Sequence, residues 1–400
     1  MRSALEAAGL KRRIGGIRLR AQQTVISPIK EMALLADSVH DAVSLGWGLP
    51  SFETPAHINE AVRRALTENV AIGKYPHPKG LPELRLAIAE KLKTEWKIEI
   101  DPQEELLVTV GAQQAVATAF QAIIDPGDEV ILFSPCFSSH IDQILLAGGT
   151  PRYVSLIEDE GWKLSPNDVD KAINKRTKAI IINSPNNPTG TVFPEDDLRA
   201  IGELAVANNL LILTDETYNF LTYDGSSPFC MFAIESLRRN LISCYSFSKE
   251  YAMTGWRVGY LRAEAGLIQE ILKIHDATVV TAPRVSQMAA LAALKGPQDC
   301  VQEFRSEFAF RRDLMCSRLD RMGRIFSYQQ PNGAYYILPR INIPGVDSFD
   351  FALRLLYEAK VVTTPGDAFG PAGSGHLRLC FAVTSEAINQ AFDRMEKFSI

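Results

Sequence analysis

Two uninterrupted apolar segments, KAIIINS at 178–184 and NLLILTD at 209–215, most constrain what this chain can fold into. A strand with one face in water alternates apolar and polar residues, because successive side chains point to opposite faces. These segments instead carry apolar side chains at consecutive positions, which is typical of strands buried on both faces of a parallel sheet. The chain is therefore expected to contain a parallel sheet covered by helices.

Helical and strand patterns alternate through the first part of the chain, which predicts an α/β architecture. Apolar residues at helical spacing indicate one helix over 81–96, and a second helix over 111–124 begins with a glycine. Further strands are expected at 105–110, 128–134 and 240–248. We expect these segments to build one large domain.

The C-terminal part has a different pattern. A long charged amphipathic helix is expected over 299–322, and short strands follow at 333–338, 361–366 and 376–382. This order predicts a smaller α+β domain. A chain of 400 residues is also too long for one ordinary core. We therefore expect two domains, a large one and a small one, with the boundaries 49–285 for the large domain and 1–48 plus 286–400 for the small domain.

Composition and charge exclude several classes of protein. The net charge is −5 and the pI is near 5.8, which argues against nucleic acid as a partner because phosphate binding needs a basic surplus. None of the six cysteines forms a CxxC pair, so neither a metal site nor a disulfide framework is indicated, and the reducing cytoplasm is the simplest location. No apolar run approaches the roughly 18–20 residues that span a bilayer, so no membrane partner is expected. The first twenty residues are basic and fit either a targeting segment or an arm folded onto the body.

Polar and aromatic side chains gather directly after the predicted strands. In parallel sheets, ligand groups lie beyond the carboxyl ends of the strands, so these side chains are expected on one edge of the sheet. Each group alone has an ordinary structural explanation, such as a turn, a helix cap or a solvated charge. The set as a whole points to a binding site, and its segments are GAQ (111–113), PCF (135–137), SPNNPTG (184–190), DETY (215–218) and SFSKEYAMTGWRVG (246–259).

This set resembles the pyridoxal-phosphate-dependent aminotransferases of fold type I, the class I/II aminotransferase family that includes aspartate aminotransferase. The order and separation of SPNNPTG, TDETY, SFSKEYAMTGWRVG and HLRLCFA match the family, and the resemblance extends from residue 44 to the last strand. It implies an enzyme with a mostly parallel seven-stranded sheet covered by helices, plus a smaller α+β domain. It also implies pyridoxal 5'-phosphate as the cofactor.

The resemblance assigns the cofactor ring to five side chains. Lys249 is expected to hold the aldehyde as a Schiff base and to act as the proton shuttle. Asp215 is expected beside the ring nitrogen, where a carboxylate keeps that nitrogen protonated. Asn187 and Tyr218 correspond to the family's pair of donors to the phenolic oxygen, and Phe137 is placed to stack on the ring.

The resemblance also assigns the phosphate group and a second subunit. A helix N-terminus, hydroxyls and a guanidinium suit a phosphate, and the residues concerned are Gly111, Ala112, Gln113, Ser246, Ser248 and Arg257. Tyr75 matches a tyrosine that reaches the phosphate of the neighbouring subunit. The resemblance therefore implies a homodimer with shared active sites.

The resemblance implies that Arg378 binds the substrate. Its guanidinium is expected to hold the α-carboxylate with two parallel hydrogen bonds. On the strand 376–382, Arg378 lies on the opposite face from the apolar residues around it. Trp47 and Gly48 occupy the family's substrate-facing loop, and Asn187 lies nearby. The expected reaction is a ping-pong transamination between an L-amino acid and a 2-oxo acid, with 2-oxoglutarate as one acceptor.

The substrate side chain and the reaction type stay open at this point. Gln113 stands where some aspartate-specific relatives carry a lysine, which weakens the case for a dedicated aspartate enzyme. Arg18, Arg20 and Arg284 are candidate partners for a second carboxylate. A carbon–sulfur β-lyase, or another fold type I enzyme, uses the same cofactor and much of the same site. A cofactor-binding regulatory domain is a more distant alternative, since no DNA-binding pattern precedes the fold.

Overall fold

The structure is a computed structural model that describes residues 26–398. The basic N-terminal segment, with Arg18 and Arg20, lies outside the described residues. Within 26–398, every helix is too short or too polar to cross a lipid bilayer.

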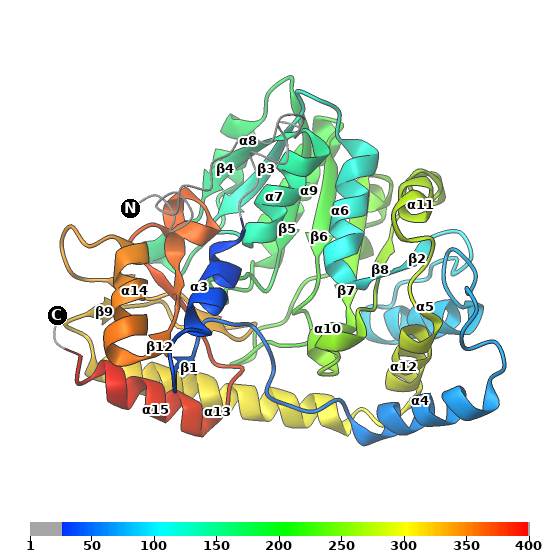
Figure 1. The fold of residues 1–400 in the computed structure, drawn as a ribbon. Coiled ribbons are helices and arrows are strands. Elements are labelled where there is room, and N and C mark those ends of the chain that lie inside the picture. The colour runs from blue at the N-terminus through cyan, green and yellow to red at the C-terminus, as the bar shows by residue number, and fades with distance from the viewer. Residues whose placement is uncertain (1–25, 399–400) are drawn as a thin grey trace, which may run out of the picture.

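A seven-stranded sheet forms the centre of the molecule, in the order β2–β8–β7–β6–β5–β3–β4 (Figure 1). β8 is antiparallel to both of its neighbours, and all the other pairs are parallel. The mostly parallel seven-stranded sheet is thus confirmed. The strands are β2 (Leu106–Thr109), β3 (Glu129–Ser134), β4 (Thr150–Ser155), β5 (Thr177–Asn183), β6 (Leu211–Asp215), β7 (Leu241–Ser246) and β8 (Gly259–Arg262).

Both faces of the central strands are buried, as their uninterrupted apolar sequence predicts. In β5, Ile180 and Ile182 pack into one apolar cluster, whereas Ala179 and Ile181 pack into a second cluster on the opposite face. One face is covered by α8 (Pro166–Ala172) and α9 (Glu195–Ala207), and the other by α6 (Gly111–Ile123), α7 (Ser138–Ala147) and α11 (Ala265–Val279).

Three further helices pack together next to the β2–β8 edge of the sheet. They are α4 (Ala56–Glu68), α5 (Pro82–Trp96) and α12 (Arg284–Lys295). Their buried side chains share one apolar cluster with Leu106 of β2 and Tyr260 of β8. α5 starts one residue inside the helix expected from the sequence, with a proline in its first turn, where a missing N–H costs nothing.

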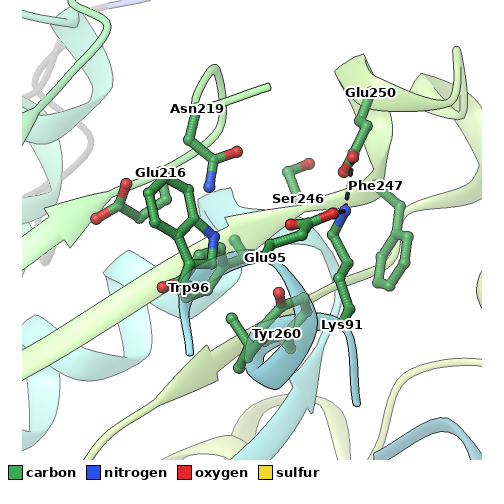
Figure 2. A pocket seen from close by; sticks show the side chains of 11 residues that line it. Lys91, Glu95, Trp96, Glu216, Asn219, Ser246, Phe247, Glu250 and Tyr260 are labelled. Carbon is green, nitrogen blue, oxygen red and sulfur yellow. Dashed lines mark hydrogen bonds and ion pairs between the residues drawn. The ribbon is translucent and has the colours of Figure 1, made fainter. Parts of the chain in front are cut away.

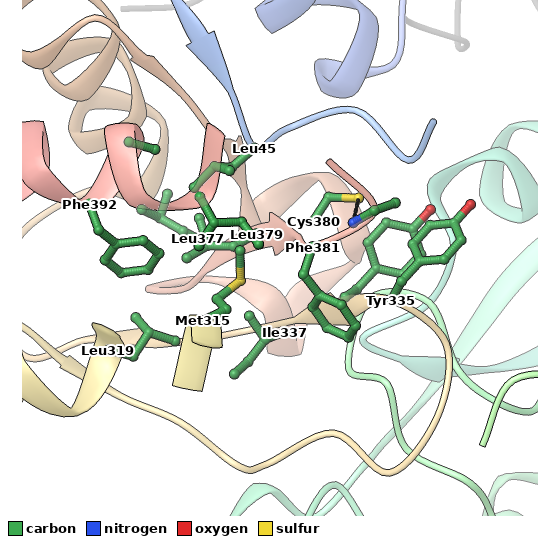
Figure 3. Packing of buried hydrophobic residues seen from close by; sticks show 14 of the residues in the cluster. Leu45, Met315, Leu319, Tyr335, Ile337, Leu377, Leu379, Cys380, Phe381 and Phe392 are labelled. Atoms are coloured by element: carbon green, nitrogen blue, oxygen red, sulfur yellow. Dashed lines mark hydrogen bonds between the residues drawn. The ribbon is translucent and has the colours of Figure 1, made fainter. Parts of the chain in front are cut away.

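The C-terminal residues, together with residues 28–45, build a second packing unit around short strands (Figure 1). The three-stranded sheet has the order β10–β14–β13, and β1 pairs with β12 in parallel. Figure 3 shows its core, in which Leu377 and Leu379 of β14 meet Met315 and Leu319 of the long helix. The elements are α3 (Pro28–Ala36), β1 (Val43–Ser44), α13 (Asp299–Arg321), β9 (Phe326–Ser327), β10 (Tyr336–Ile337), β11 (Arg340–Ile341), α14 (Ser348–Ala359), β12 (Val361–Val362), β13 (Thr364–Pro365), β14 (Leu377–Cys380) and α15 (Ser385–Met395).

Several predicted strands are shorter than expected. Only Tyr336–Ile337 of the segment 333–338 form a strand, and the segment 361–366 is divided into β12 and β13. The strand predicted over 240–248 ends at Ser246, because Phe247–Glu250 form the one-turn helix α10. The Ser246 hydroxyl accepts a hydrogen bond from the Ser248 amide and so caps that turn. Short 3-10 turns complete the chain at Glu158–Glu160, Met231–Ala233, Glu235–Asn240, Thr254–Trp256, Gly366–Phe369 and Pro371–Gly373.

Candidate active site

A cavity of about 720 Å³ lies beyond the carboxyl ends of the parallel strands, and β14 of the C-terminal unit contributes to its wall. Its lining comes from segments that follow β2, β3, β5, β6 and β7, as predicted for a parallel sheet. The structure places most of the predicted site residues in this lining: Trp47, Gly48, Ala112, Gln113, Phe137, Asn187, Asp215, Tyr218, Ser246, Ser248, Lys249, Arg257 and Arg378.

The Lys249 amine points into this cavity from α10. Its Nζ donates a hydrogen bond to the Gly48 carbonyl oxygen at 2.7 Å. Burial, with the cations Arg257 and Arg378 nearby, lowers the pKa of Lys249 from its usual value to about 8. A substantial fraction of this amine is therefore neutral near pH 8 and able to act as a nucleophile or base.

Asp215 lies at the end of β6 and is buried. Burial alone would raise the pKa of this carboxyl, but hydrogen bonds from His140 and Thr217 outweigh it and lower the pKa. The His140 Nε2 lies 3.2 Å from Oδ2, and the Thr217 hydroxyl donates to Oδ1 at 2.6 Å. Asp215 is thus held as a carboxylate. His140 is a partner that the sequence reasoning missed, since a lone histidine on a helix gives no signal.

Arg378 is a buried cation without a carboxylate partner among residues 26–398. Its side chain is on β14 and the residue is 1% exposed. The guanidinium donates to Asn187 Oδ1 at 3.1 Å and to the Gly46 carbonyl oxygen at 2.6 Å, and its Nε has no partner within the described chain. A buried charge is normally paired, so this arginine is prepared for an anionic ligand.

Three tyrosines lie close together at one corner of the cavity, and two of them, Tyr218 and Tyr336, line it. The Tyr218 hydroxyl lies 2.9 Å from the Tyr336 hydroxyl, and the Tyr335 hydroxyl donates to the Gly48 carbonyl oxygen at 3.2 Å. Burial and the neighbouring Tyr336 raise the pKa of Tyr218, so its phenol stays protonated and can donate a hydrogen bond. Tyr336 also lies under Arg378, whose guanidinium carbon is 4.4 Å from the ring centre. The sequence reasoning did not assign Tyr336 to the site.

The N-terminus of α6 closes the other end of the cavity. Gly111 has a φ of +78°, and a Cβ there would lie 2.7 Å from Arg257 Nη2, so only glycine allows this approach. Arg257 Nη1 lies 3.5 Å from the Ser248 hydroxyl. Free helix N–H groups, hydroxyls and a guanidinium therefore converge, which is the donor set that a phosphate requires.

Tyr75 and Arg284 are not part of the cavity of their own chain. Tyr75 is 78% exposed and does not line it. Arg284 donates from Nε to the Lys74 carbonyl oxygen and from Nη2 to the Tyr75 carbonyl oxygen, both at 3.1 Å. The guanidinium thus stabilises the segment that carries Tyr75.

Comparison with known proteins identifies the family. Residues 40–395 match the family model of the class I and II aminotransferases. The chain belongs to this family. It is 39% identical to an aspartate aminotransferase of Pyrococcus abyssi and 37% identical to aromatic-amino-acid aminotransferase 2 of Thermococcus litoralis, in each case over 93% of this chain and 95% of the relative. A solved Thermus thermophilus aspartate aminotransferase with maleate superposes with a TM-score of 0.88 at 36% identity, covering 95% of this chain and 98% of the other.

The chain is therefore an aminotransferase and, like its family, uses pyridoxal phosphate. The expectations for fold, enzyme class and cofactor are confirmed. The cavity fits this cofactor: Gly111 leaves room beside a cation, Asp215 is a buried carboxylate, and Lys249 is a buried amine with a lowered pKa.

Proposed function

We propose that this aminotransferase moves the α-amino group of L-amino acids to a 2-oxo acid, with 2-oxoglutarate as one acceptor. The observation that carries the proposal is Arg378, a buried guanidinium without a carboxylate partner in the described chain, in the same cavity as Lys249. Amino acids and 2-oxo acids both carry a carboxylate next to the reacting carbon. One arginine can therefore bind donor and acceptor in turn, which suits a ping-pong reaction.

Five residues would hold the cofactor ring. Lys249 would bind its aldehyde, Asp215 would accept a hydrogen bond from its ring nitrogen, and Phe137 would cover one face of the ring. Asn187 and Tyr218 would donate to the phenolic oxygen. When bound, pyridoxal phosphate supplies an electron sink for the electrons left behind when the substrate α-proton is removed.

The phosphate would bind where α6 begins. Its partners would be the backbone around Gly111, Ala112 and Gln113, the hydroxyls of Ser246 and Ser248, and the Arg257 guanidinium. The exposed Tyr75 ring would reach the corresponding site of a second copy, so we propose a homodimer with shared active sites. All six cysteines are free thiols, which suits a reducing cytoplasm. We also propose that the two domains divide near residue 285.

Lys249 would move the proton at the reacting carbon. Its amine is neutral in part near pH 8, so it can accept the α-proton as a base and return it as an acid. The Gly48 carbonyl oxygen accepts a hydrogen bond from the Lys249 amine. This bond would orient the amine whenever it is not covalently attached to the cofactor.

The mouth of the cavity suits more than one kind of substrate side chain. Ile26, Leu146 and Trp47 offer apolar surface there, while Lys30 offers a cation for a second carboxylate. Relatives of this chain are named for aspartate and for aromatic amino acids. We therefore propose broad use of amino donors, with Gln113 contributing a neutral donor where other enzymes place a lysine.

A half-reaction screen tests this proposal. The cofactor-loaded protein is mixed with one amino acid at a time, without any 2-oxo acid, and the absorbance change of the cofactor is followed. We expect acidic and aromatic L-amino acids to react and to release the matching 2-oxo acid, one molecule for each molecule of bound cofactor. If L-amino acids changed the spectrum no faster than the corresponding carboxylate-free amines, the proposed role of Arg378 would be wrong.

A further inference from the structure

A partly buried cluster of charges lies behind the helical turn that carries Lys249. Lys91 of α5 places its Nζ 2.7 Å from Glu250 Oε1 and 2.6 Å from Glu95 Oε1. Figure 2 shows the Lys91 amine in contact with both carboxylates, with Phe247 beside it. Trp96 and Tyr260 line the same small pocket. The transamination site does not include this cluster, because none of the three charged groups lines the large cavity.

The ion pair of Lys91 with Glu250 is mostly removed from water. The Lys91 side chain is 17% exposed and that of Glu250 is 12% exposed. Burial favours the neutral form of Lys91, but Glu250 and Glu95 outweigh it and raise the pKa of the amine. Lys91 is therefore a permanent cation at physiological pH.

α10 needs such an outside contact. It has only four residues, and a single helical turn is not stable on its own. Neighbouring side chains on a helix point about 100° apart, so Lys249 and Glu250 leave the turn in different directions. Lys249 extends into the cavity towards Gly48, while Glu250 extends to the ion pair on α5.

We infer that Lys91 is a positioning residue for the reaction: by pairing with Glu250 it fixes α10 and thereby the place of the Lys249 amine. The inference rests on the role proposed for Lys249. A buried ion pair is often no more stabilising than well-packed apolar residues of the same size, whereas its hydrogen bonds have a defined geometry. A displacement of a reacting group by about 1 Å can cost about 100-fold in rate, so a loosened turn is expected to slow proton transfer.

Steady-state kinetics of the cofactor-loaded enzyme test the inference. We expect Lys91→Met to lower kcat by about 10- to 100-fold while the KM values for both substrates stay within about threefold, since Arg378 is untouched. Lys91→Arg keeps a cation on the two carboxylates and should recover most of kcat. Lys93→Met is the matched control, because Lys93 lies on the same helix as Lys91. Its ion pair with Glu99, which follows the helix, is exposed to water, with side-chain exposures of 66% and 77%.

A second variant and a second readout keep the inference testable if Lys91→Met is unstable. Glu250→Gln leaves Lys91 paired with Glu95 and should lower kcat in the same way. In the cofactor-free chain, lysine-directed chemical labelling, read by peptide mass spectrometry, should modify Lys249 faster in both variants than in the wild type or in Lys93→Met. This readout does not depend on turnover, so it separates failure of the inference from failure of the proposed function. Unchanged kcat and unchanged labelling in Glu250→Gln, or no recovery of kcat in Lys91→Arg, would overturn the inference.

Discussion

Replacing Arg378 with lysine isolates the binding of the substrate α-carboxylate. Lysine keeps the positive charge but has one nitrogen, so it cannot present two parallel donors to a carboxylate. The guanidinium nitrogens of Arg378 also serve Asn187 and Gly46, which a single ammonium cannot do with the same geometry.

The size of the effect follows from the lost hydrogen bond. A hydrogen bond to a charged group contributes about 1.5–3 kcal/mol, and each 1.4 kcal/mol corresponds to a factor of ten. Loss of one arm of the fork should therefore lower kcat/KM for amino acids about 10- to 150-fold. The assay is single-turnover conversion of the cofactor by an amino acid, compared with the amine that lacks the α-carboxylate.

Two controls decide how the result is interpreted. Arg318→Lys alters another buried arginine of the C-terminal unit, but Arg318 pairs with Asp393 and Glu396, so kcat/KM should not change. The slow reaction of the carboxylate-free amine should be the same in the wild type and in Arg378→Lys. The reasoning would be refuted if amino acid and amine lost rate by the same factor, because Arg378 would then act on the structure and not on the carboxylate.

Three further predictions follow from the same cavity. In the cofactor-free protein, the pKa of Lys249 is lowered from about 10.5 to about 8. Protonated Lys249 therefore lowers the free energy of unfolding below pH 8, and this loss of stability disappears as the pH rises to about 10.5. Lys249→Met should therefore raise the free energy of unfolding by about 3 kcal/mol at pH 7 in urea titrations, and the gain should vanish near pH 10.5. Gly111→Ala pushes a methyl group against Arg257, so equilibrium dialysis should show at least about tenfold weaker cofactor binding, whereas Gly127→Ala, with open space around it, should not. Asp215→Asn removes a buried negative charge, and kcat should fall about 10²- to 10³-fold while absorbance still shows bound cofactor.

The sequence predicted the fold where burial leaves a clear pattern. β5 and β6 are apolar at successive positions, and α13 matches the expected long helix within one residue. β4 and β8 were not identified from the sequence. β4 is an edge strand that contains a proline and exposed polar residues, and β8 has only four residues. Both strands form because they pair with a neighbouring strand, and such pairing leaves no pattern in the local sequence.

The sequence predicted those site residues that lie within recognisable motifs. Lys249 and Asp215 lie in recognisable segments directly after strands, and the structure brings both to the cavity. His140 and Tyr336 could not be found in this way, because they reach the cavity through the packing of α7 and β10 against distant parts of the chain. The same holds for Lys91, which is far from Glu250 in sequence and meets it only in the folded protein.

The most direct test of the central claim is to incubate the cofactor-loaded enzyme with an L-amino acid and 2-oxoglutarate and to quantify the products. The account predicts glutamate and the matching 2-oxo acid in equal amounts, with no turnover by Lys249→Ala. Release of ammonia together with pyruvate, without formation of glutamate, would contradict it and would favour the carbon–sulfur lyase alternative.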